Sequence, residues 1–126
     1  MSWTVPASAR NVAQVRQSVV DFACANGVPE QQVGDVRLAV SEAVTNAFVH
    51  GFRGVAEQGT VIVAAAVSEE WIDVRVTDDG SGMAPRDDSP GIGLGLPLIR
   101  HLADQFDHRR NPSGAGTELW MRFLFT

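Results

Sequence analysis

The sequence predicts a single α+β domain in which helices cover one face of a mixed, mostly antiparallel sheet. The chain has 126 residues, which fits one compact domain over residues 1–126. Its helical and strand-like segments are grouped along the chain and do not alternate. This grouping favours a two-layer α/β sandwich over a doubly wound parallel sheet.

The first half of the chain predicts one strand and two helices. Residues 2–6 read as a short edge strand. Ser8 is a suitable N-cap for a helix over 9–26, in which apolar residues recur at helical spacing, and Gly27 ends it. A second helix over 29–50 begins with a proline, which the first helical turn tolerates.

The second half predicts four strands and one helix. Residues 60–67 and 71–78 are apolar, strand-like runs separated by a short turn. Residues 96–105 read as a helix, and 106–109 read as a strand. The last run, 117–125, reads as the final strand.

Lysine is absent from the chain, because all ten basic residues are arginines. Walker-type phosphate loops, eukaryotic-type protein kinases and Schiff-base enzymes all require a lysine, so these three chemistries are excluded. Arginine codon bias in a GC-rich genome is the simplest explanation of the absence. The net charge of -5 argues against a general nucleic-acid-binding protein.

The single cysteine, Cys24, excludes an internal disulfide and is expected to be a small core residue, because it lies in an apolar stretch. No apolar run approaches the roughly 18 residues that a membrane span needs, and no signal peptide opens the chain. We therefore expect a cytoplasmic protein that contacts neither membrane nor nucleic acid directly.

The second predicted helix carries a polar stripe. Glu42, Asn46 and His50 are spaced by four residues and therefore share one face. An asparagine oxygen is a hard ligand that suits Mg²⁺, and a glutamate one turn away can accept a proton from a nucleophile. Small neighbours are expected to let a ligand approach this stripe closely; the alternative is a solvated helix face. These neighbours are Ala39, Ala43 and Ala47.

Two glycine-rich segments are further candidates for ligand binding. Asp78 ends a strand before Gly80 and Gly82, and its carboxylate can accept a hydrogen bond from an amino group such as that of adenine. The run 91–96 opens a helix, where glycine N–H groups can hold phosphates without a lysine. An acidic turn and a Rossmann loop are the respective alternatives, but residues 85–90 do not read as the strand that a Rossmann loop requires.

Four sequence elements, taken in order, resemble the GHKL ATPase and kinase superfamily over residues 8–125. They are Glu42-x-x-x-Asn46, Asp78-x-Gly80-x-Gly82, Gly91-x-Gly93-x-Gly95 and Gly116-Thr117. They are similar to the N box, the two glycine boxes and the terminal GT element of the Bergerat ATP-binding fold. The stretch 41–52 looks especially like the bacterial anti-sigma factors that are also serine kinases.

The resemblance implies ATP and Mg²⁺ as cofactors and gives roles to individual residues. Asn46 would ligate Mg²⁺, and Glu42 would be the general base or would orient the attacking hydroxyl. Asp78 would accept a hydrogen bond from the adenine amino group, and Thr117 would support this contact through its hydroxyl or a water. The other nucleotide-binding positions would be Gly80, Gly82, Met83, Gly91, Gly93, Leu94, Gly95 and Leu96.

The resemblance also implies an ATP-dependent serine/threonine kinase that acts as an anti-sigma factor. It would phosphorylate a serine of an anti-anti-sigma (STAS-type) partner and sequester a sigma factor as a homodimer. Arg16 falls where the family places a partner-contacting arginine, although a helix-face arginine is ordinarily solvated. The segment 83–90 is short and acidic, so we expect weak nucleotide retention. The alternatives are a switch kinase acting on a signalling scaffold and a non-catalytic nucleotide-binding module.

Overall fold

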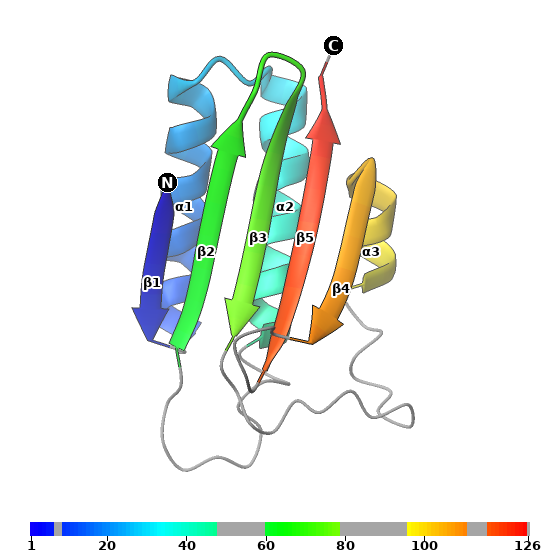
Figure 1. Ribbon diagram of the computed structural model, residues 1–126. Coiled ribbons are helices and arrows are strands. Elements are labelled where there is room, and N and C mark those ends of the chain that lie inside the picture. The colour runs from blue at the N-terminus through cyan, green and yellow to red at the C-terminus, as the bar shows by residue number, and fades with distance from the viewer. Residues whose placement is uncertain (7–8, 48–59, 79–95, 111–115, 126) are drawn as a thin grey trace.

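The computed structural model describes residues 1–6, 9–47, 60–78, 96–110 and 116–125. Within these ranges one five-stranded sheet has the order β1-β2-β3-β5-β4, and its pairings are all antiparallel. The described helices lie together on one face of the sheet (Figure 1). The predicted two-layer α+β architecture is therefore confirmed. The elements are β1 (Ser2–Pro6), α1 (Ala9–Ala25), α2 (Glu30–Asn46), β2 (Thr60–Val67), β3 (Trp71–Asp78), α3 (Leu96–Leu102), β4 (Gln105–Arg110) and β5 (Thr117–Leu124).

The connection between α1 and α2 is a tight turn that the sequence locates correctly. Gly27 has φ +81°, a left-handed conformation that glycine adopts without a steric penalty. Pro29 is extended, with φ -60° and ψ 150°, and its carbonyl accepts the N–H of Val33 at 3.0 Å. Pro29 therefore precedes the helix as its N-cap and is not part of the first turn. Residues 48–50 of the predicted second helix lie outside the described residues.

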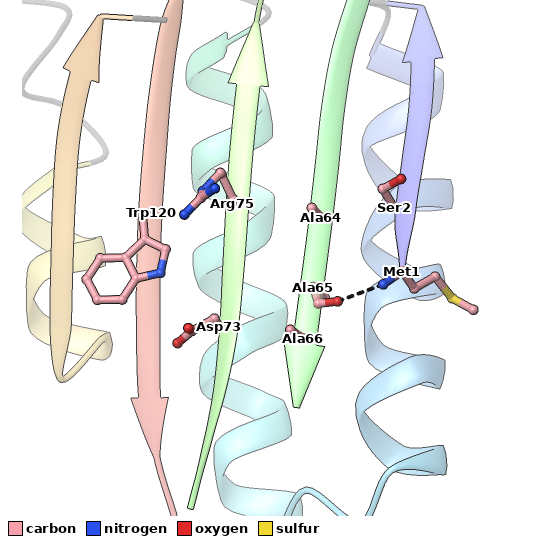
Figure 2. A pocket seen from close by; sticks show the side chains of 8 residues that line it. All are labelled: Met1, Ser2, Ala64, Ala65, Ala66, Asp73, Arg75 and Trp120. Atoms are coloured by element: carbon pink, nitrogen blue, oxygen red, sulfur yellow. Dashed lines mark hydrogen bonds between the residues drawn. The ribbon is translucent and has the colours of Figure 1, made fainter. Parts of the chain in front are cut away.

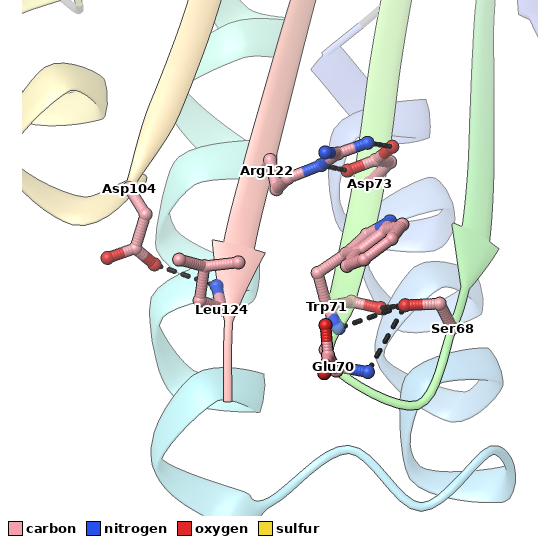
Figure 3. Close-up of polar contacts among 7 residues, drawn as sticks. All are labelled: Ser68, Glu70, Trp71, Asp73, Asp104, Arg122 and Leu124. Atoms are coloured by element: carbon pink, nitrogen blue, oxygen red, sulfur yellow. Dashed lines mark hydrogen bonds and ion pairs between the residues drawn. The ribbon is translucent and has the colours of Figure 1, made fainter. Parts of the chain in front are cut away.

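The third helix is shorter than predicted, because its last expected residues are used by the sheet. Gln105 already pairs with Arg122 in β4. Just before it, the Asp104 N–H donates to the Arg122 carbonyl, and the Asp104 carboxylate accepts the Leu124 N–H at 2.7 Å (Figure 3). These sheet contacts replace the next helical turn.

The core lies between the helices and the inner face of the sheet. It is rich in valine, a β-branched residue that packs well on a pleated surface. Cys24 is exposed, so its predicted core position is wrong. Ala23 is the residue of that last turn that faces the core, and Cys24 lies about 100° further around the helix. The largest fully buried side chains are Phe123, Ile72, Ile99, Met121, Val15, Val19, Val36, Val40, Val44, Val61, Val63 and Val74.

The other face of the sheet is open to solvent across β1, β2, β3 and β5. A hollow of about 400 Å³ lies on it and extends from the alanines of β2 across β3 to Trp120 of β5 (Figure 2). Next to it, the Arg122 guanidinium donates two hydrogen bonds to Asp73, at 2.7 and 2.8 Å (Figure 3). The same guanidinium lies 4.3 Å from the centre of the Trp71 ring. The hollow is lined by Met1, Ser2, Ala64, Ala65, Ala66, Asp73, Arg75 and Trp120.

Candidate functional site

The fold brings the described parts of the four sequence elements to one end of the molecule. The C-terminal end of α2, the end of β3, the start of β5 and the start of α3 all lie at this end (Figure 1). This follows from the directions of the elements, because β3 and β5 are antiparallel neighbours and α2 runs back along the sheet. Segments separated by up to about seventy positions in the chain thus meet at one edge, as the resemblance requires.

The polar stripe of α2 is present as predicted for Glu42 and Asn46. Both side chains are half-buried, one helical turn apart on the same helix. Among the described residues Glu42 has no hydrogen bond and no ion pair. Its carboxylate is therefore not neutralised by a described cation, which suits a group that must accept a proton. His50 lies outside the described residues.

The alanines of α2 face inward, so they do not surround the polar stripe as predicted. Ala39, Ala43 and Ala47 have relative exposures of 0, 3 and 5% and belong to the core cluster. They form the stripe beside the one that carries Glu42. Their small side chains allow α2 to pack closely, and the polar stripe is left at the edge of the core.

Asp78 and Thr117 lie together at the ends of adjacent strands. Thr77 pairs with Glu118 across the antiparallel strands β3 and β5, so Asp78 lies beside Thr117. Asp78 is 3% exposed and Thr117 is 7% exposed. A carboxylate and a hydroxyl that share one buried corner can together accept and relay hydrogen bonds from an amino group. This is the chemistry expected at an adenine.

Gly116 makes this close approach possible. Its φ is +102°, and a Cβ at this position would lie 2.0 Å from the Asp78 carbonyl oxygen and 2.8 Å from Asp78 Oδ1. A side chain would therefore collide with the backbone of β3. The sequence indicated only a turn here, because the requirement for glycine comes from a strand nearly forty residues earlier in the chain.

The phosphate-binding positions are only partly described. Leu96 begins α3 directly after the second glycine box, as the sequence predicted. The other predicted positions lie outside the described residues: Gly80, Gly82, Met83, Gly91, Gly93, Leu94 and Gly95. Arg100 of α3 holds its guanidinium 5.0 Å from the centre of the Phe106 ring.

Among the described residues, Asn46 is the predicted ligand of a magnesium ion. The described residues contain no group of three or more histidine, cysteine, aspartate or glutamate side chains arranged to enclose a metal. Asn46 is the last residue of α2 and carries an amide oxygen, a hard donor of the type that Mg²⁺ takes. Mg²⁺ characteristically keeps several waters and takes few protein ligands beside substrate phosphates. Asn46 is thus compatible with Mg²⁺, and a closed protein cage is not required.

Arg16 lies on α1 and is half-buried. It is not a simply solvated helix-face arginine, because its Nη1 donates to the Ser41 hydroxyl of α2 at 3.1 Å. The Ser41 contact is one that the sequence did not predict. The sequence also did not predict the ion cluster around Glu118. Its Oε1 atom lies 2.7 Å from Arg109 Nη2 and 3.7 Å from Arg75 Nε. The contacts of Arg16 with Ser41 and of Arg75 with Glu118 join segments that are distant in the chain, and the Arg109 contact depends on the register of β4 against β5.

Comparison with known proteins identifies the domain. The sequence pattern of the histidine kinase-like ATPase domain matches residues 5–123. The anti-sigma F factor of Clostridium acetobutylicum is 29% identical over 130 residues, which cover 94% of this chain and 89% of that protein. The serine-protein kinase RsbW of Listeria monocytogenes is 35% identical over 115 residues, which cover 79% of this chain and 73% of that protein.

Solved structures agree in fold. A histidine kinase domain from the Erythrobacter litoralis EL346 blue-light activated histidine kinase superposes with a TM-score of 0.63 at 28% identity. The match covers 94% of this chain but 61% of that one, which is less than two thirds of its length. The SiaB-SiaC complex from Pseudomonas aeruginosa contains a chain with a TM-score of 0.54 at 13% identity, which supports the fold alone.

Proposed function

The chain belongs to the histidine kinase-like ATPase domain family, and from this premise we propose that it is an ATP-dependent protein serine/threonine kinase that acts as an anti-sigma factor. Its substrate is a serine of an anti-anti-sigma (STAS-type) protein, and its other partner is a sigma factor. The observation that carries the proposal is that the C-terminal end of α2, the end of β3 and the start of β5 lie at one end of the fold (Figure 1). Glu42 and Asn46 belong to the first of these, and Asp78 and Thr117 to the other two. The names of the relatives from Clostridium and Listeria support the same function.

The adenine is proposed to bind at the corner formed by Asp78, Gly116 and Thr117. The Asp78 carboxylate accepts a hydrogen bond from the adenine amino group, and the Thr117 hydroxyl supports it. The phosphates then extend toward the start of α3, where helix N–H groups attract negative charge. The Asn46 amide oxygen holds Mg²⁺, which supplies positive charge to the phosphate oxygens.

Glu42 is proposed to act on the acceptor. Its carboxylate accepts the proton of the serine hydroxyl, whose oxygen forms a bond to the γ-phosphorus of ATP. The bond from that phosphorus to the β–γ bridging oxygen breaks at the same time, and ADP leaves. Because phosphoryl transfer depends mainly on positioning and charge stabilisation, Glu42 must be held accurately relative to Asn46.

The test is transfer of labelled γ-phosphate from Mg-ATP to recombinant STAS-type proteins of the source organism. We expect Glu42→Ala and Asn46→Ala to lower the rate at least about 100-fold, the usual size of a general-base contribution. Retained transfer in both variants would contradict the roles. Binding of ATP without transfer to any STAS-type protein would instead favour a non-catalytic module.

Nucleotide binding is also proposed to depend on Mg²⁺, because the chain has no lysine to neutralise phosphate charge. Calorimetry in Mg²⁺ and in EDTA measures this directly. We expect the ATP affinity to fall below detection in EDTA. An unchanged affinity without Mg²⁺ would show that another group carries the charge neutralisation.

We propose further that two copies associate through the open face of the sheet. This face carries the hollow beside Trp120 and exposed apolar side chains such as Ile62, which is 42% exposed. Its charged residues are largely paired within the face, as in Asp73 with Arg122. Burying already paired charges costs less than burying single ones. We also propose a cytoplasmic location. In the part of the chain that the structure describes, no helix is long and apolar enough to cross a bilayer.

A further inference from the structure

A side-chain hydrogen bond joins the two long helices directly beside the proposed general base. Arg16 Nη1 of α1 donates to Ser41 Oγ of α2 at 3.1 Å, across 25 positions of sequence. Ser41 immediately precedes Glu42. By contrast, Ser18 of α1 donates its hydroxyl to the Gln14 carbonyl of its own helix at 3.1 Å. The Ser41 bond thus connects elements, whereas the Ser18 bond does not.

Arg16 differs from Arg109 and Arg122 in that its hydrogen-bond partner is a neutral hydroxyl. Arg122, also half-buried, is held by the Asp73 carboxylate, and Arg109 is held by Glu118. Within the described ranges Arg16 has no acidic partner and bonds only to a neutral hydroxyl. A half-buried charge has few hydrogen-bonding alternatives, so the bond that it does make is directional and costly to lose.

The packing of α2 matters because the helix carries Glu42, the proposed general base. The face of α2 that enters the core carries Val36, Val40 and Val44 as well as alanines, so apolar packing holds the helix in the core. Apolar packing is not directional, whereas the Ser41 hydrogen bond adds a directional contact at the edge of the helix. Glu42 has no described hydrogen bond of its own. The position of its carboxylate is therefore set by the position of the helix itself.

We propose that Arg16 and Ser41 are positioning residues for Glu42. Their hydrogen bond fixes the position of α2 against α1 at the residue before the base, so that the carboxylate meets the acceptor hydroxyl in a productive geometry. Small misplacements of a catalytic group have large effects on rate. This inference rests on the proposed kinase function, and it concerns the rate of transfer and not the binding of ATP.

A double-mutant cycle on phosphoryl transfer tests the proposal. Rates are measured with Mg-ATP and the STAS-type protein that the wild type phosphorylates, for Ser41→Ala, Arg16→Gln and the double variant. We expect each single variant to lower kcat about 10-fold, since a hydrogen bond to a charged group is strong. The double variant should be no slower than the singles, because all three lose the same contact.

Three controls separate positioning from other roles. Ser41→Thr keeps the hydroxyl and should restore most of kcat. Ser18→Ala and Gln17→Ala remove polar groups of α1 that do not reach α2, and both should leave kcat unchanged. The Kd for ATP should be unchanged in every variant, because none of these residues belongs to the adenine corner.

The outcomes are distinguishable. If the wild type is active but the effects of Ser41→Ala and Arg16→Gln multiply, the two residues act separately and the positioning role is wrong while the kinase function stands. If Arg16→Gln raises only the KM for the partner, Arg16 is a docking residue and the proposal is again wrong. An inactive wild type removes the kinase function and this role together. Failure of both single variants to fold would make the contact a stability determinant and would also overturn the proposal.

Discussion

At the scale of single residues, Gly116 shows how a short polar motif depends on backbone space. The sequence indicated a Gly-Thr turn, and the structure explains why the residue before Thr117 is glycine. Its left-handed φ and its contact with the Asp78 backbone each disfavour any side chain. The adenine corner can close only because this position has no Cβ.

Substituting Gly116 should therefore affect both stability and binding. We expect Gly116→Ala to lower the free energy of unfolding by about 2 kcal/mol or more, because strained backbone and a steric clash act together. ATP binding should weaken as Asp78 is displaced. Gly34→Ala is the matched control: the position is helical with nothing within 4 Å, so stability should rise by up to about 1 kcal/mol. Urea unfolding of both variants measures the difference, and equal stability of Gly116→Ala and wild type would contradict the clash.

His108 provides a pH-dependent contribution to stability. Burial lowers the pKa of its imidazole below the usual 6.5, and the neighbouring Asp107 opposes this in part. The unfolded chain therefore takes up a proton near pH 6.5, whereas the folded chain does so only at lower pH. Because the unfolded state binds more protons in this window, the free energy of unfolding must fall as the pH is lowered from above 6.5 to the folded-state pKa.

Replacing His108 should flatten that dependence. We expect His108→Gln to lose less stability than the wild type between pH 7.5 and pH 5.5, as measured by urea unfolding at both values. His101 is exposed on α3, and His101→Gln should retain the wild-type slope. Parallel stability curves for His108→Gln and wild type would mean that another group carries the pH dependence.

At the scale of elements, β5 contributes side chains both to the core and to the open face of the sheet. Its inward residues Leu119, Met121 and Phe123 belong to the core. Its outward residues Glu118, Trp120 and Arg122 build the polar contacts of the open face. From Leu119 onward the alternation is that of a strand with one buried face. The sequence predicted the strand but not its partners on β3 and β4, because these depend on the strand register.

Arg122 holds β5 to β3 on the open face. Its guanidinium donates two hydrogen bonds to Asp73, which raise the pKa of Arg122, and it lies over the Trp71 ring (Figure 3). A lysine cannot reproduce the two-pronged geometry or the stacking of a planar group. We expect Arg122→Lys to lower Tm, whereas Arg37→Lys, at an exposed position of α2, should not. Calorimetry on both variants measures this, and equal Tm values would show that the contact adds no stability.

At the scale of the whole molecule, the two faces of the sheet differ in what covers them. The helices cover one face and the proposed nucleotide site lies at its end, whereas the other face is open and partly apolar (Figures 1 and 2). Such a division leaves room for a second copy without blocking the site. The proposed homodimer follows from this arrangement.

Two exposed apolar residues allow a matched test of the dimer. Ile62 on the open face is 42% exposed, and Leu38 on α2 is 43% exposed. We expect Ile62→Glu to shift the protein to a monomer, since charges in the centre of an interface are strongly disfavoured, and Leu38→Glu to leave the dimer intact. Sedimentation of the wild type and both variants gives the masses. A monomeric wild type, or a dimer that survives Ile62→Glu, would contradict this interface.

The sequence by itself determined the order of the elements, the two-layer architecture and the family resemblance, because these depend on periodicity and on motifs that are local in the chain. It also identified Glu42, Asn46, Asp78 and Thr117 as candidates, because their residue types suit one chemistry. Only the tertiary structure decided which stripe of α2 faces the core, that Cys24 is exposed, that Gly116 contacts Asp78 and that Arg16 reaches Ser41. Each of these depends on how distant segments pack together, which local patterns do not specify.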